Sequence, residues 1–355
     1  MTADKGETSD MFRRSILAGA ALALGIASSA AAQQALPIRI GAANATDHAA
    51  AFIGVERGIF AKHGLDAKLV MYQTGVEMIN GLLSGAQDVN IMGSIPFLAG
   101  VSNGQPLVLI GHLHGDAVNM SYSMNNSIVA TPASGIKEGD VKALKGKKIG
   151  LPRGTGAEGY LLGVLAANGM KDSDVTLVNI APSNQTTALR QGDVDALAAW
   201  EPWGSISSLR VPGAYRVVSG GCDACYDPGT ILTTRANIAS KAEQLRRFMV
   251  AFAEAHQWLR QNYDAAAEIN MRWIQGVDLD VMKLSIRRSG YDLRVTRNTL
   301  DGYDRKTIPA LVADKRMART VPAGSIVDPQ FYKHVEQVAP QFFSDLPPIP
   351  ADRRL

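Results

Sequence analysis

Polar side chains that could contact a ligand follow short apolar runs at several points along the chain. Thr46, Asp47 and His48 follow one such run, and Gln73 follows the next. In open α/β sheets, ligands bind beyond the carboxyl ends of the strands. We therefore expect these four side chains to contact a bound molecule. The alternative for Thr46 and Asp47 is to cap the helix that follows them.

Two further loops have the composition of anion-binding turns. Ser94 is expected to cap a helix that has Pro96 in its first turn, and Gly154-Thr155-Gly156 opens a later helix. Unpaired N–H groups at a helix N-terminus favour an anionic oxygen, and two glycines let a ligand approach the backbone. The second loop lacks the Gly-Lys-Ser/Thr ending of a nucleotide-binding loop. We expect both loops to contact the ligand.

An aromatic and acidic pair follows the apolar run around Leu197. Trp200 and Glu201 stand at the carboxyl end of this expected strand, where they could supply a stacking wall and a charged acceptor. The alternative is that Trp200 packs in the core and Glu201 is solvated. We favour a role for both in the ligand site.

Two histidines lie two residues apart. His112 and His114 would share a face of a strand, and Asp116 follows them. The three could form a metal site, but we favour a hydrogen-bonding role at the ligand site for this histidine segment, with His112 as the ligand contact. We expect no metal and no cofactor.

Cys222 and Cys225 are the only two cysteines of the chain. In an oxidising compartment this spacing can close a small disulfide, which is the reading we favour. Free or ligand-facing thiols and a redox or metal role are the alternatives. A thioredoxin-type site would place the pair at a helix N-terminus, and no helical pattern follows Cys225 at once.

Bulk composition excludes several classes of protein. The chain has 355 residues, a net charge of +3 and 6% aromatic residues, so nothing favours binding to nucleic acid. Paired carboxylates, a nucleophile elbow and zinc-ligand spacings are all missing from the sequence. The sequence therefore favours a protein that is not an enzyme.

The N-terminal segment is typical of an export signal. Arg13 and Arg14 precede the uncharged stretch Ser15–Ala32, which ends in small residues. We predict a signal peptide over residues 1–32, cleaved after about Ala32, and a periplasmic protein. The paired arginines are similar to a twin-arginine signal, and the general secretory route is the alternative. A membrane anchor is the other alternative for this stretch.

Strand-like and helical patterns alternate along the rest of the chain, which predicts parallel strands and an α/β fold. Among the expected helices are one over residues 49–62 and one over residues 296–313. The series is interrupted over residues 125–139 and starts again, and from about residue 236 the pattern is helical. We predict a first lobe over residues 33–124, a second over 125–228, and a return to the first lobe with a helical tail over 229–355. Two chain crossings then form a hinge, and the cleft between the lobes is the expected ligand site.

The order and spacing of these pieces resemble the nitrate, sulfonate and taurine branch of periplasmic binding proteins, which includes relatives that bind pyrimidine precursors of thiamine. The similarity covers most of the chain after the signal. It rests on the following segments: Gly58-Ile59-Phe60, Gly64-Leu65, Leu82–Val89, Gly93–Pro96, Leu144–Gly150, Ala188–Asp195 and Trp200-Glu201-Pro202. The segments around His112 and Cys222 are not general features of that branch.

The resemblance implies a two-lobed fold of the type II periplasmic binding class, with a helical C-terminal segment packed on the first lobe. It also implies a monomer that captures a small polar or anionic organic ligand, such as a sulfonate, for the permease and ATPase of an ABC importer. Two alternatives stay open: an enzyme similar to those that build the thiamine pyrimidine, and a sensor subunit that presents its ligand to a receptor.

Overall fold

In the computed structural model, the described residues are 1, 34–115, 117–118, 125–220 and 226–355. The predicted signal peptide, apart from its first residue, lies outside them, as do Asp116, Cys222 and Cys225. The predictions made for those residues stay predictions. Residues Leu36–Leu355 form one compact unit that contains two five-stranded sheets.

The first sheet has the strand order β2-β1-β3-β10-β4. Apolar residues dominate its central strands, which are buried on both faces as in other α/β folds. Its strands are β1 (Leu36–Ala43), β2 (Leu65–Tyr72), β3 (Val89–Gly93), β4 (Leu107–His114) and β10 (Gly229–Thr234). β1 runs parallel to β2 and β3, whereas β10 runs antiparallel to β3 and β4.

The second sheet repeats this arrangement with the order β7-β6-β8-β5-β9. Its strands are β5 (Asn126–Ala130), β6 (Lys148–Leu151), β7 (Thr176–Asn179), β8 (Ala196–Trp200) and β9 (Tyr215–Ser219). β6 runs parallel to β7 and β8, and β5 runs antiparallel to β8 and β9. In each sheet the antiparallel strand is the first one after the chain arrives from the other sheet. The expectation of purely parallel pairing is therefore wrong at β5 and β10.

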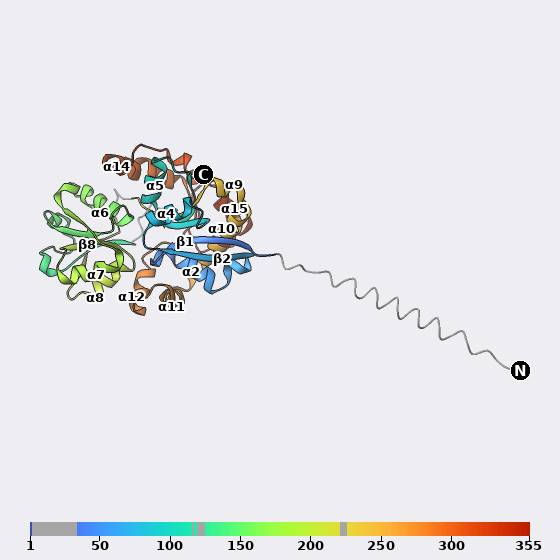
Figure 1. Ribbon diagram of the computed structural model, residues 1–355, viewed down its shortest axis with the longest axis horizontal. Helices are drawn as coiled ribbons and strands as arrows, with labels where there is room; N and C mark the ends of the chain where they lie inside the picture. The colour runs from blue at the N-terminus through green and yellow to red at the C-terminus, as the bar shows by residue number, and fades with distance from the viewer. Residues whose placement is uncertain (2–33, 116, 119–124, 221–225) are drawn as a thin grey trace. The chain divides into compact units, whose positions relative to one another are not determined.

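Helices cover both faces of each sheet (Figure 1). In the first lobe they are η1 (Thr46–His48), α2 (Ala49–Glu56), α3 (Ile59–Lys62), α4 (Gly75–Leu83) and α5 (Ser94–Ser102). The single helix expected over residues 49–62 is wrong, because Gly58 has a φ of 66° and breaks it in two.

In the second lobe, α6 lies on one side of the sheet, and α7 and α8 lie on the other (Figure 1). These helices are α6 (Gly156–Ala167), α7 (Pro182–Gln191) and α8 (Trp203–Arg210). Short 3₁₀ turns connect the remaining strands: η2 (Pro132–Ser134), η3 (Val141–Leu144) and η4 (Asp172–Asp174).

After β10 the chain is helical, as predicted. The helices are α9 (Arg235–Ser240), α10 (Ala242–Gln261), α11 (Tyr263–Trp273), α12 (Leu279–Ile286), α13 (Arg297–Gly302), η5 (Tyr303–Thr307), α14 (Ile308–Ala313), η6 (Ala323–Ser325), α15 (Gln330–Val338), η7 (Pro340–Phe343) and η8 (Ala351–Arg353). The helix expected over residues 296–313 is present as a continuous helical stretch from Arg297 to Ala313, in which one π-helical turn, η5, lies between α13 and α14.

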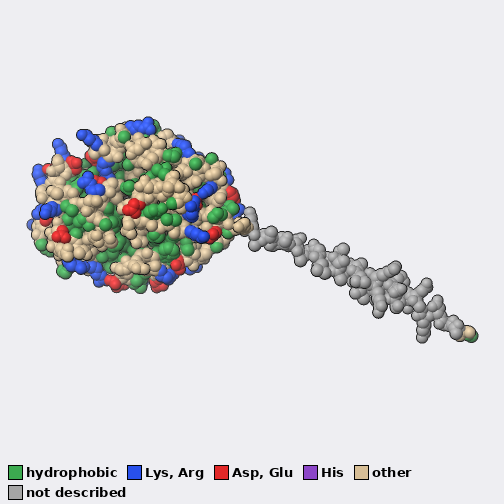
Figure 2. Space-filling view, in the orientation of Figure 1, with side chains coloured by type: hydrophobic (Ala, Val, Ile, Leu, Met, Phe, Trp, Pro, Cys, Tyr) green, Lys and Arg blue, Asp and Glu red, His purple; other side chains and the backbone are tan. Residues whose placement is uncertain are grey.

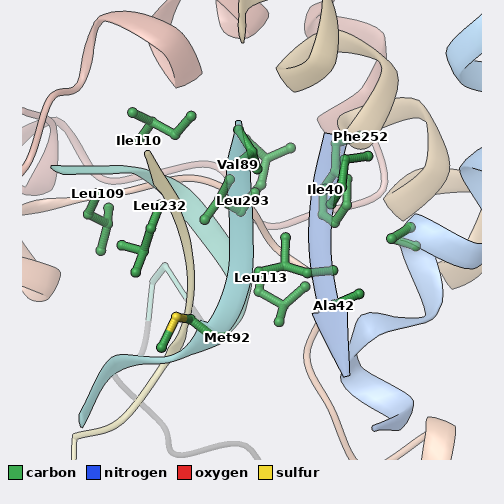
Figure 3. Close-up of a cluster of buried hydrophobic side chains, with 14 of the residues drawn as sticks. Ile40, Ala42, Val89, Met92, Leu109, Ile110, Leu113, Leu232, Phe252 and Leu293 are labelled. Atoms are coloured by element: carbon green, nitrogen blue, oxygen red, sulfur yellow. The ribbon is translucent and has the colours of Figure 1, made fainter. Parts of the chain in front are cut away.

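The C-terminal helices pack on the first lobe. Figure 3 shows Phe252 of α10 and Leu293 among buried side chains of the first sheet, including Ile40, Val89 and Leu232. All five side chains are fully buried. The second sheet has smaller apolar clusters of its own, with Tyr160 and Leu161 of α6 in the larger one. The tail thus completes the core of the first lobe and leaves the second lobe to its own helices.

The protein surface carries both signs of charge. On the face shown in Figure 2, Lys and Arg side chains are interspersed with Asp, Glu and apolar side chains. Among the described residues, no helix is both long and apolar enough to cross a membrane.

Candidate ligand-binding site

A small cavity of about 70 Å³ lies among loops of both lobes. The first lobe contributes the β1–η1 loop, the start of α4, the β3–α5 turn and the end of β4. The second lobe contributes the start of β5, the start of α6 and the end of β8. One buried water needs at least about 10–15 Å³ of such space, so the cavity has room for a small organic molecule. It lies at the carboxyl ends of parallel strands, where α/β folds bind ligands.

Asp47 is the carboxylate that the first lobe presents to this cavity, and it is only 5% exposed. Its Oδ2 lies 3.2 Å from Nε2 of His114, at the end of β4. Its Oδ1 lies 4.0 Å from Nε2 of His48 and has no hydrogen-bond partner. Burial raises the pKa of Asp47, but His48 and His114 outweigh it and hold that pKa below its ordinary value. Asp47 is therefore ionised at neutral pH.

Both histidines accept a backbone hydrogen bond on the same ring nitrogen, Nδ1. Nδ1 of His48 accepts a hydrogen bond from the Ala43 backbone N–H at 2.9 Å, and Nδ1 of His114 accepts one from Gly229 at 3.3 Å. In the neutral rings the hydrogen is then on Nε2, the atom nearer to Asp47. Burial lowers the pKa of His48, although the neighbouring Asp47 carboxylate opposes this shift.

Asp227 is the second carboxylate at the cavity, and it precedes β10. Its Oδ1 accepts hydrogen bonds from the N–H of Ser94 at 3.0 Å and from the Ser94 hydroxyl at 2.6 Å. Gly156, at the start of α6, lies so close to Oδ2 of Asp227 that a Cβ atom would overlap with it. Burial raises the pKa of Asp227 above its ordinary value, despite the two bonds from Ser94.

Apolar and aromatic side chains form the rest of the wall. Met78 of α4 and Met92 of β3 line the cavity, and Trp200 lines it from the end of β8. Thr155 also lines it, and its hydroxyl donates to the Pro152 carbonyl at 2.7 Å. The cavity therefore has a polar end around Asp47 and an apolar wall that includes Met78, Met92 and Trp200.

Six of the expected ligand residues line the cavity: Asp47, His48, Gln73, Thr155, Gly156 and Trp200. Five do not: Thr46, Ser94, His112, Gly154 and Glu201. Their assignment to ligand contact stays a prediction.

Ser94, Thr46 and Gly154, three of those five, each directly neighbour in the sequence a residue that lines the cavity. Ser94 holds Asp227, as described above. Thr46 is fully buried, and its N–H donates to the Glu201 carbonyl at 3.2 Å, which links the two lobes. The Gly154 N–H donates to Glu158 at 2.6 Å.

The other two lie deeper in the lobes. Nε2 of His112 lies 3.4 Å from the Thr299 hydroxyl of α13. Glu201 is fully buried, and its carboxylate lies 2.8 Å from Nη2 of Arg216 and 3.1 Å from Nε of Arg288. Its side chain is neither solvated nor directed at the cavity.

Helix capping follows a different pattern from the one expected. Ser94 is the first residue of α5 and Gly93 is the cap, so the expected Ser94 cap is wrong. Neither Thr46 nor Asp47 makes a capping bond, whereas Thr74 caps α4 by accepting from the Glu77 N–H at 3.4 Å.

The sequence reasoning missed Asp227, Asn125 and Asn126 as lining residues, and it named His112 rather than His114 as the ligand contact of the histidine pair. Asp227 precedes Pro228-Gly229, a pair typical of turns, and its partner Ser94 is 133 residues away. No local signal connects the two. Among the described residues, no three His, Cys, Asp or Glu side chains gather as a metal site requires.

Known proteins that are similar to this chain include binding proteins. The chain is 27% identical over 274 residues to a putative aliphatic sulfonates-binding protein of Bacillus subtilis, covering 77% of this chain and 80% of that protein. Its fold is similar to that of the alkanesulfonate-binding protein SsuA from Xanthomonas axonopodis pv. citri, with a TM-score of 0.72, 21% identity and coverage of 82% and 98%. The two-lobed α/β fold predicted from the sequence is thereby confirmed.

Two other solved structures extend the comparison. The periplasmic nitrate-binding protein NrtA from Synechocystis has a TM-score of 0.72 at 14% identity, covering 90% of this chain and 92% of that one. The desulfurization enzyme DSZB has a TM-score of 0.62 at 17% identity, covering 85% and 99%. At these identities the likeness concerns the fold alone.

The family comparison covers the whole second sheet, four strands of the first sheet and most residues that line the cavity. The model described as "NMT1/THI5 like" matches residues 45–266, which include the β1–η1 loop, the whole second lobe and β10. The chain therefore belongs to the NMT1/THI5-like family.

Proposed function

We propose that this chain is a periplasmic solute-binding protein that captures a small polar organic molecule between its lobes and delivers it to the permease and ATPase of an ABC importer. The observation that carries the proposal is the cavity that both lobes line, with the partly unpartnered carboxylate of Asp47 inside it. The similarity to proteins described as binding sulfonates and nitrate supports the same role. We also propose a monomer, with the signal cleaved after about Ala32 and lobe boundaries near residues 124 and 228.

The side-chain chemistry of the cavity supports binding over catalysis. Among its described lining residues, the hydroxyl groups are those of Thr74 and Thr155. Thr74 accepts from a backbone N–H, and Thr155 donates to a backbone carbonyl, so neither is arranged against a histidine as a nucleophile would be. Among the described lining residues, the fold likeness to DSZB is therefore not matched by a hydroxyl nucleophile.

Ion pairs between the lobes support a protein that closes on its ligand. Arg288, after α12, pairs with Glu201 of the second lobe, and Arg316, after α14, pairs with Glu158 of α6 at 3.1 Å. Each pair connects the C-terminal part of the first lobe to the second lobe, on either side of the cavity. Opening the lobes would break both pairs, and a bound ligand that bridges the lobes would favour their formation.

Two measurements test the proposal. Native mass spectrometry of the protein isolated from its own periplasm should detect a small molecule bound in one copy per chain. Deletion of the gene should abolish uptake of that molecule, which separates transport from a sensing role. Chemical conversion of the molecule by the purified protein would instead support the enzyme alternative.

A further inference from the structure

We infer that the cavity takes a small organic cation, whose N–H donor group binds Asp47, and that it excludes sulfonate, nitrate and carboxylate anions that lack such a group. This inference rests on the proposed solute-binding function and names the class of solute. It is carried by the unpartnered oxygen of Asp47, by the positions of the protein's own carboxylates and by the charges around the cavity.

The first observation is the incomplete hydrogen bonding of Asp47. Its Oδ2 is occupied by His114, whereas its buried Oδ1 receives no hydrogen bond and lies too far from His48 Nε2 to do so. A buried carboxylate oxygen without a donor is costly, and native structures rarely leave one. Because Asp47 lines the cavity, a ligand N–H group can supply the missing donor, and a positive charge on it would compensate the carboxylate.

The second observation concerns the turns that could hold an oxyanion. The N-terminal N–H of α5, at Ser94, already donates to Asp227. Gly156 at the start of α6 lies against the other oxygen of the same carboxylate, and the Gly154 N–H donates to Glu158. The protein's own carboxylates thus occupy the positions where the sequence predicted a ligand anion.

The third observation is the sign of the charges around the cavity. Its described lining residues include two carboxylates, Asp47 and Asp227, and no Lys or Arg. The segments 116, 119–124 and 221–225, which are outside the described residues, contain no Lys or Arg in the sequence. A sulfonate here would lie beside ionised Asp47, and no Lys or Arg of the described lining would balance its charge.

The nearest basic side chains are paired elsewhere. Arg153 and Arg316 pair with Glu158, at 2.7 and 3.1 Å. Arg216 and Arg288 pair with the buried Glu201. Trp200 and the two methionines complete a wall that suits the carbon skeleton of an organic cation, since an aromatic face attracts cations.

The test compares small probes that share a carbon skeleton but differ in charge. Ethylammonium, 2-hydroxyethylammonium and acetamidinium are the cations, and ethanesulfonate, acetate and nitrate are the anions. We expect at least one cation to raise the Tm of the purified protein, by about 5 °C at a hundred times its Kd, and no anion to do so. Stabilisation by an anion, or none by any cation, would overturn the inference.

Two variants make the test specific. Asp47→Asn should remove the stabilisation by cations, and Asp66→Asn, an exposed carboxylate on β2, should keep it. If Asp47→Asn still responds to cations like the parent protein, Asp47 is not the binding group and the inference fails.

A measurement on the unaltered protein covers the case in which Asp47→Asn does not fold. The molecule released on denaturing the periplasmic protein should be retained by a cation exchanger. Release of an anion without an amine would overturn this inference and leave the solute-binding function standing. Finding no bound molecule by any of these routes would instead remove the proposed function itself.

Discussion

Arg288 and Glu201 form an ion pair between the two lobes, with the guanidinium Nε 3.1 Å from a carboxylate oxygen that is fully buried. Arg288 follows α12, which packs on the first lobe and also contacts α8 of the second. Glu201 follows β8, the strand that places Trp200 in the cavity wall. The pair therefore connects the two lobes next to a side chain that lines the cavity.

Replacing Arg288 should loosen this closure without unfolding either lobe. In Arg288→Met, Glu201 keeps its contacts with Arg216 and with the Ser205 N–H, so the buried carboxylate is not left alone. We expect an affinity loss of about tenfold, or about 1.4 kcal/mol. Isothermal titration with the identified ligand measures the affinity, and small-angle scattering measures the opening of the free protein.

The neighbouring arginine provides a matched control for this prediction. Arg287 pairs with the exposed Asp264 at 2.8 Å, within the first lobe. Arg287→Met should therefore change neither the affinity nor the radius of gyration. Equal effects of the two variants would show that the Arg288–Glu201 pair has no special part in closure.

Gly156 should be sensitive to a single added methyl group. In Gly156→Ala, the Cβ atom would overlap with Oδ2 of Asp227 and displace the carboxylate from Ser94. Overpacking of this kind costs about 1–3 kcal/mol. We expect a Kd at least tenfold higher and a lower Tm. Gly324→Ala is the control, because nothing lies within 4 Å of the position its Cβ would take.

Trp200 should contribute to affinity more than to stability, because it lines the cavity and is only partly buried. Trp200→Ala is expected to raise the Kd by about tenfold or more, since aromatic contacts with a ligand are worth about 1–2 kcal/mol. Trp200→Phe should recover part of the loss. An unchanged Kd in both variants would place the ligand away from the β8 end of the cavity.

Buried histidines should make the protein less stable in mild acid. Burial lowers the pKa of His112 to about 3, below the value near 6.5 of an exposed histidine. Between these pH values the unfolded chain binds a proton that the folded protein does not, so the free energy of unfolding falls as the pH falls. One such histidine contributes about 1 kcal/mol for each pH unit below 6.5.

A variant isolates the contribution of His112. Burial also lowers the pKa of His48 and His256, so part of the acid sensitivity should persist in His112→Gln. We expect a shallower dependence on pH below 6.5 in this variant than in the parent protein. Denaturant unfolding over this pH range measures the slopes, and equal slopes would contradict the prediction.

The parts of the fold that could be predicted are those with a local signal. Alternating apolar residues identified β1 and β2, and helical periodicity of apolar residues identified most of the helices. The rule that ligands bind beyond the carboxyl ends of strands located Asp47, Gln73 and Trp200 at the cavity. These inferences need only neighbouring residues. The identity of the ligand depends on contacts between segments that are distant in the sequence. The same holds for the lining residues of the cavity outside these loops.

The strands β5 and β10 show why the remaining part was missed. β5 begins with Asn and Ser, residues typical of loops, and β10 begins with Gly directly after Asp-Pro, a sequence typical of turns. Both are strands because a neighbouring strand on each side completes their hydrogen bonds. Gly58 shows the opposite case, since one glycine broke a helix that periodicity alone would continue.

The central place of β10 also determines when the first lobe can finish folding. β10 lies between β3 and β4, yet the ribosome makes it only after the entire second lobe. Until then β3 and β4 each have an open edge that can pair wrongly, whereas every strand of the second sheet is already present. The lobe that is synthesised first is therefore the last to complete its sheet.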